Sequence, residues 1–231
     1  MYDFYYFNGD SYSVEDQNKK SWVQEFIKLS ELPQEKCFNH AIRGSNNHRI
    51  IRDSIESLGN LKKRYKRIFC IIGFSFVHRD ELWDDETKKL ETLDGFLDRK
   101  NIPEELKFKY HLQNINHQMI HFYTNLFMFV NLLEKWNIDY LIFSAANNSD
   151  FGSLNWDYLK SLDVYDTISS NPKIYNLHEF YIQDWAAKNN INVKKETGHL
   201  CDDNGYRLFA EEIKTKIKNL NYKVDQDNQN C

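Results

Sequence analysis

The sequence has little glycine and little proline, with 8 and 3 of these residues among 231. An average protein of this length would carry about 16 glycines, so collagen-like and low-complexity filaments are excluded. Disorder is excluded as well, because 41% of the residues are hydrophobic and 15% are aromatic. The length suits one globular domain with a sizeable core.

The chain also lacks an excess of charge of one sign, since 30 basic side chains stand against 34 acidic ones. A net charge of −4 gives no basic field, so we expect no nucleic-acid partner. No run approaches the roughly 18 apolar residues of a membrane-spanning helix. The first residues show no basic segment followed by a cleavage site. We therefore expect a cytoplasmic protein with no membrane partner.

Metal-binding and disulfide patterns are missing too. The four cysteines are widely spaced and form no Cys-x-x-Cys pair, whereas zinc ribbons need ligands close in sequence. We expect reduced thiols. His117 and His121 stand four residues apart, a metal-compatible spacing, but the glutamate of the zincin arrangement is missing, which favours a solvated or core role. The sequence predicts no metal and no cofactor.

Short apolar runs typical of buried strands alternate with segments of helical spacing. The strand candidates are 3–8, 37–42, 68–76, 138–143 and 191–193, and the helix candidates are 22–29, a segment capped by Asn46 or Asn47, 103–136, 178–188 and 204–220. A less regular region covers 145–171. The alternation predicts an α/β fold, a three-layer α/β/α sandwich with a parallel sheet. We expect a single domain over 1–220 and a polar, frayed tail over 221–231.

Three of the predicted strands end at a glycine-containing turn with a polar residue. These turns contain Ser11, Gly44 and Ser75. Ligands gather at the carboxyl ends of strands in parallel sheets. The three turns therefore predict one site.

The residues near these turns suit nucleophilic catalysis. A serine becomes a nucleophile when a histidine can take its proton and a carboxylate orients that histidine. Ser11 follows the first strand, while Glu196 and His199 stand three residues apart before the last helix. The N–H of Gly44 is a candidate oxyanion donor, because no Cβ obstructs close approach. The plain alternatives are turn positions for Ser11 and Gly44 and a helix-capping role for His199.

These segments resemble the conserved blocks of the SGNH (GDSL-like) hydrolase superfamily, which has a flavodoxin-like fold. Its first block, a strand followed by Gly-Asp-Ser, is matched at 7–11, and its second, a glycine after the next strand, at 39–46. Its last block, Asp-x-x-His-Leu before a helix, is matched at 196–210. The blocks occur in the family's order and span nearly the whole chain. The resemblance implies a Ser11, His199 and Glu196 triad that acts on small acyl esters, often acetyl groups on carbohydrate, without a metal.

Two positions depart from the family's pattern. The family acid is usually Asp, and Glu196 is one methylene longer. The third block usually reads Gly-x-Asn-Asp, with the Asn donating to the oxyanion, but here it reads Gly-Phe-Ser-Phe at 73–76. Ser75 is the expected substitute, beside the N–H groups of Ser11 and Gly44. The remaining polar groups near these turns are expected to bind substrate: Asn46, His78 and Arg79.

The sequence therefore predicts a serine esterase acting on a small ester or an acylated glycan. One alternative is transfer of an acetyl group to a glycan hydroxyl. The other is a binding or structural protein, for instance a viral, virion-associated one, that keeps the fold without turnover. The missing Asn and the Glu in place of Asp are the features that favour this last alternative. The acyl group and the oligomeric state stay open.

Overall fold

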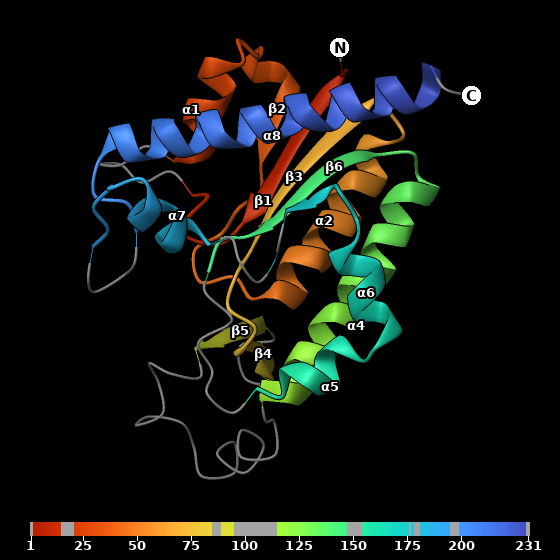
Figure 1. The fold of residues 1–231 in the computed structure, drawn as a ribbon, viewed down its shortest axis with the longest axis vertical. Helices are drawn as coiled ribbons and strands as arrows, with labels where there is room; N and C mark the ends of the chain where they lie inside the picture. The colour runs from red at the N-terminus through yellow and green to blue at the C-terminus, as the bar shows by residue number, and fades with distance from the viewer. Residues whose placement is uncertain are drawn as a thin grey trace.

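A computed structural model of the chain describes residues 2–14, 21–84, 89–94, 115–146, 154–175, 177, 181–194 and 199–229. Its central sheet has five parallel strands in the order β2-β1-β3-β6-β7 (Figure 1). The strands are β1 (Phe4–Gly9), β2 (Cys37–Asn39), β3 (Ile68–Phe74), β6 (Asp139–Ser144) and β7 (Ile174–Tyr175). The predicted parallel sheet is confirmed.

Helices cover both faces of this sheet (Figure 1). One face carries α2 (Asn47–Leu61), α4 (Ile115–Lys135), α5 (Trp156–Lys160) and α6 (Asp163–Ser169). The other face carries α1 (Trp22–Leu29), α7 (Ile182–Lys188) and α8 (Asp203–Gln229). A short 3-10 helix, η1 (Gln34–Lys36), precedes β2. The architecture is the predicted three-layer α/β/α sandwich.

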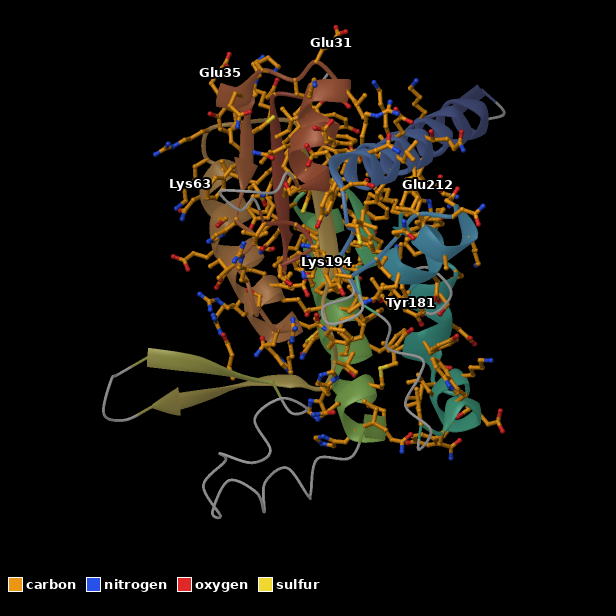
Figure 2. The ribbon with its side chains drawn as sticks, turned by 90° about the vertical axis from the view of Figure 1, so that its left-hand side faces the viewer. Glu31, Glu35, Lys63, Tyr181, Lys194 and Glu212 are labelled. Atoms are coloured by element: carbon orange, nitrogen blue, oxygen red, sulfur yellow. The ribbon has the colours of Figure 1, made fainter. Side chains whose placement is uncertain are left out.

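A separate antiparallel hairpin follows β3. Its strands are β4 (Arg79–Asp84) and β5 (Lys89–Asp94). The hairpin extends away from the three layers, as Figure 2 shows. A bidentate ion pair from Arg52 on α2 to Glu81 on β4, with N–O distances of 2.6 and 3.3 Å, connects its base to the domain.

The alternation of side chains along β3 divides the core into two halves. Ile68, Cys70 and Ile72 pack with α2 and α4, whereas Phe69 and Ile71 pack with α1, α7 and α8. A strand that is covered on both faces needs apolar residues at every position. This is why β3 reads as a continuous apolar run.

Several predicted elements differ from the structure. The hairpin β4–β5 lies in the charged stretch after β3, and α5 and α6 lie in the region predicted to be irregular. These elements have five to seven residues each, which is too short to show a clear helical or strand periodicity of apolar residues. The predicted strand 191–193 is a single bridge between Val193 and Leu200. Helix α8 continues to Gln229, into the segment predicted to be a frayed tail. The helix start predicted at Pro103 lies outside the described residues.

Candidate active site

The turn after β1 presents Ser11 at the carboxyl end of the sheet. The N–H of Ser13 donates to the carbonyl of Asp10 (3.0 Å), and the N–H of Tyr12 donates to Oδ1 of the Asp10 side chain (3.1 Å). Gly9 is required at the end of the strand, because a Cβ there would lie 2.5 Å from the Ser13 hydroxyl and 2.8 Å from the Gly73 carbonyl. The tight turn therefore needs both the glycine and the aspartate of the Gly-Asp-Ser sequence.

His199 lies beside this turn although 188 residues separate it from Ser11. The Oγ of Ser11 is 3.1 Å from Nε2 of His199, a hydrogen-bond distance. The segment before α8 is paired with the segment after α7: the N–H of Lys194 donates to the carbonyl of His199 (2.8 Å), and the N–H of Cys201 donates to the carbonyl of Asn192 (3.0 Å). Figure 2 labels Lys194 in this pairing. The backbone of the loop thus fixes the position of the imidazole.

The ring of Tyr12 packs against the imidazole of His199. The two rings are stacked, with 4.4 Å between centroids and 9° between planes. The phenol is 2% exposed, and its hydroxyl accepts a 2.7 Å hydrogen bond from Nε2 of Gln183 on α7. Burial raises the pKa of Tyr12, so the phenol stays neutral. The sequence reasoning did not single out this residue, and its position next to the serine was the one available signal.

Asp10 is fully buried and is held by two groups that come from beyond β3. Its Oδ2 accepts from the hydroxyl of Ser75 (2.7 Å) and from Nη1 of Arg79 (3.2 Å). Arg79 also donates to Ser75 Oγ (2.7 Å). Burial raises the pKa of Asp10, while the Arg79 guanidinium and the hydrogen bonds act to lower it. Asp10 therefore organises the serine turn from inside the protein.

These contacts involve two residues whose expected roles at the site stay predictions. Ser75 was predicted to donate to an oxyanion, but its hydroxyl is buried and its hydrogen is directed to Asp10. Arg79 was predicted to bind substrate oxygen, but its guanidinium is engaged with Asp10 and Ser75 and lies over the Phe76 ring, 5.0 Å from the centroid. Both residues serve the turn that carries Ser11. The third block therefore contacts Asp10, the middle residue of the Gly-Asp-Ser turn.

The turn after β2 lies next to the serine turn. The N–H of Ile42 donates to the carbonyl of Gly9 (3.3 Å), and the N–H of Ser45 closes the turn on the carbonyl of Ile42 (3.2 Å). Gly44 takes a φ of +73°, which glycine adopts without strain. The predicted meeting of these strand ends is therefore seen for the first two strands and, through Ser75, for the third.

Asn46 caps α2 and has an unused donor. Its Oδ1 accepts from the N–H of Arg49 (2.7 Å), while its Nδ2 is buried and, among the residues that the structure describes, has no hydrogen-bond partner. The side chain is 0% exposed. A buried amide without a partner loses the hydrogen bonds that it would make in water. This amide is thus a buried donor, two residues after Gly44, without a partner among the described residues.

Two other predicted residues are placed less completely. His78 packs against the ring of Phe76, with 5.0 Å between centroids, and is half-buried. Glu196 lies outside the described residues, so its distance from His199 stays untested. In the described ranges, no group of three or more His, Cys, Asp or Glu side chains is arranged to hold a metal ion. No described helix is long and apolar enough to cross a membrane.

No protein-family model matches the sequence, and no curated protein matches it significantly. Solved structures do match. The chain is similar to the psychrotrophic esterase EstA from Pseudoalteromonas sp. at 15% identity, with 94% of this chain and 98% of that chain covered and a TM-score of 0.51. It is similar to an acetyl-xylooligosaccharide esterase from Geobacillus Stearmophilus at 12% identity, with 93% and 94% covered and a TM-score of 0.50.

A third similar structure is a Bacillus subtilis protein at 11% identity, with 96% of this chain and 57% of that chain covered and a TM-score of 0.53. At these identities the likeness concerns the fold. The chain shares a three-layer α/β fold with these structures, which is the fold class that the sequence predicted. Two of the three similar structures are described as esterases.

Proposed function

We propose that the protein is a serine esterase that hydrolyses small acyl esters, acetyl esters above all. The observation that carries the proposal is the 3.1 Å separation of Ser11 Oγ and His199 Nε2. A nucleophile and a base within hydrogen-bond reach are the first requirement of acyl transfer through an acyl-enzyme. Both groups lie where strand ends of the parallel sheet meet, which is where ligands bind in such folds.

The chemistry follows from this pair. Ser11 Oγ attacks the ester carbonyl while Nε2 of His199 takes the hydroxyl proton, and the carbonyl electron pair moves onto oxygen. Collapse of the tetrahedral intermediate breaks the bond to the alcohol, which leaves with the proton from His199. Water then attacks the acyl-enzyme by the same route and releases the acid and the free serine. We assign to Glu196 the role of orienting His199.

The oxyanion of the intermediate needs donors. We assign this role to the N–H groups of Ser11 and Gly44 and to Nδ2 of Asn46. The amide of Asn46 supports the assignment because it is buried and has no protein partner among the described residues. It takes the place of the amide that the third block lacks. The loss of one oxyanion donor typically lowers the rate about 10²–10³-fold. A donor from Asn46 in place of the missing amide is therefore important for turnover.

The proposal is tested by hydrolysis of 4-nitrophenyl acetate together with labelling by a serine-reactive fluorophosphonate. Wild-type protein is expected to turn over the ester and to carry the label on the peptide that contains Ser11. An acyl acceptor that outcompetes water would indicate acetyl transfer in place of hydrolysis. Absence of both turnover and label in folded protein would overturn the proposal and favour a binding or structural role.

The ring of Tyr12 is expected to set how well His199 is held. Tyr12→Leu removes the stacked ring and is predicted to lower kcat about tenfold with little change in KM, because a loosely held imidazole is misaligned more often. Tyr12→Phe is the matched control, since it keeps the ring and removes only the hydrogen bond from Gln183. It should retain kcat within about twofold. Equal loss in the two variants would show that the hydroxyl, and not the stacked ring, matters.

A further inference from the structure

A pocket of about 260 Å³ opens between α2 and α4, next to the residues that follow β3. The two helices lie side by side on one face of the sheet (Figure 1). Ten side chains from three parts of the chain line the pocket: Asn47, His48 and Ile51 on α2, Val77 and Arg79 after β3, and His117, Gln118, His121, Phe122 and Asn125 on α4. Its walls therefore include Arg79, which contacts Asp10 of the serine turn.

The lining is rich in groups that can be cationic. Arg79 and three histidines contribute to it, and none of the ten described lining residues is acidic. His117 and His121 lie one helical turn apart, with 4.2 Å between ring centroids. His48 reaches the same space from α2, where its Nδ1 lies 3.3 Å from the amide nitrogen of Asn125. The amides of Gln118 and Asn125 add further hydrogen-bond donors.

The histidines disfavour one another's positive charge. Burial lowers the pKa of His121, and the neighbouring His117 and His48 lower it further. A bound anion between the rings would relieve this repulsion, and each ring would then donate a charge-assisted hydrogen bond. A metal ion is not the indicated ligand, because the described residues contain no group of three ligands in a metal-binding arrangement.

Two of the lining residues connect the pocket to the candidate active site. The side chain of Asn47 braces the backbone of Ser75, accepting from its N–H (2.7 Å) and donating to its carbonyl (3.1 Å). Arg79 contacts Asp10, whose other carboxylate oxygen holds the turn at Ser11. A ligand group in the pocket would therefore sit one layer of side chains away from the serine turn.

We propose that this pocket binds an anionic group, a carboxylate or a phosphate, on the alcohol part of the ester that Ser11 attacks. The proposal rests on the proposed esterase function and narrows its substrates to acyl esters of acidic alcohols such as acidic sugars. The histidines and amides bind the anion, while the apolar Ile51, Val77 and Phe122 contact the body of the substrate.

The first test compares three acetyl esters: an acetylated methyl glucoside, an acetylated methyl glucuronide and an acetylated glucose 6-phosphate. KM for at least one acidic ester is expected to be about tenfold below that of the neutral one. The double variant His117→Gln/His121→Gln should abolish that preference. Lys135→Gln, which removes a cation at the exposed end of α4, is the matched control and should change nothing. Preference for the glucuronide or for the phosphate identifies which anion is bound.

The second test separates the pocket from the catalysis. In Ser11→Ala protein, methyl glucuronide or glucose 6-phosphate should shift the NMR signals of His48, His117 and His121. The shift of His121 should grow as the pH falls, because its pKa is lowered and its ring gains charge only at lower pH. Arg79 is the other charged group among the described lining residues. If the sugar ligands shift these NMR signals but the wild-type protein hydrolyses none of the esters, the anion pocket is supported and the proposed esterase function is overturned. If the wild type hydrolyses all three esters with equal KM values and the ligands shift no histidine signal, anion binding in the pocket is overturned while the esterase function stands.

Discussion

Replacing Ser11 by alanine is expected to lower kcat/KM for an acetyl ester by about 10³–10⁶-fold, and His199→Gln should lower it by a similar factor. The two residues act as one unit, because Ser11 attacks only while His199 removes its proton across their 3.1 Å separation. The double variant should therefore be no slower than the slower single variant. What remains in each case is the rate supplied by substrate binding and the oxyanion donors.

The measurement is steady-state hydrolysis of 4-nitrophenyl acetate, with urea unfolding of each variant as the control for structure. Both side chains are only partly buried, and the substitutions are small in volume, so the midpoint of unfolding should change little. Multiplicative losses in the double variant would mean that the serine and the histidine act independently. That outcome would contradict the proposed proton transfer even if each single variant were slow.

Replacing Arg79 by methionine is expected to destabilise the protein by about 3–5 kcal/mol at neutral pH. Asp10 is 0% exposed, and Arg79 is the cation beside it, with its Nη1 3.2 Å from Oδ2. Removing one partner of a buried ion pair leaves an uncompensated charge, and this is the most costly way of breaking such a pair. Urea unfolding monitored by tryptophan fluorescence would measure the change.

The same variant should depend on pH in a defined direction. Without Arg79 the pKa of Asp10 rises further, since burial then acts with less opposition. A carboxyl whose folded-state pKa is raised stabilises the fold below its unfolded value, near pH 4, and that contribution is lost as the pH rises through the folded value. The deficit of Arg79→Met relative to wild type should therefore be largest at neutral pH and shrink as the pH falls toward 4.

A double variant checks the cause of the deficit. Asp10→Asn keeps an oxygen that can accept from the N–H of Tyr12 and places an amide where Oδ2 accepts from the hydroxyl of Ser75. Arg79→Met with Asp10→Asn should therefore be more stable than Arg79→Met alone, and its unfolding should lose the pH dependence. If the double variant were as unstable as the single one, the packing of Arg79 on Phe76 would account for the loss instead.

Local patterns in the sequence were sufficient for much of the fold. The apolar run of β3 indicated a buried strand, and the capping residues Asn46 and Asn47 indicated the start of α2. These features arise from interactions between residues close in sequence, so the sequence pattern alone predicts them. The hairpin and β7 were missed, because the charged residues of β4 show no clear alternation and two residues of β7 show none at all.

The sequence by itself determined that Ser11 and Gly44 follow the first two strands and that His199 precedes the last helix. It could do so because the residues that form turns and end strands are close together in the chain. Only the tertiary structure decided what the buried polar groups do. The hydroxyl of Ser75 and the guanidinium of Arg79 both donate to Asp10, the ring of Tyr12 stacks on His199, and histidines from two helices line one pocket. Each of these contacts joins residues far apart in the chain. Most buried polar groups must find a partner in three dimensions, and no spacing along the sequence specifies that partner.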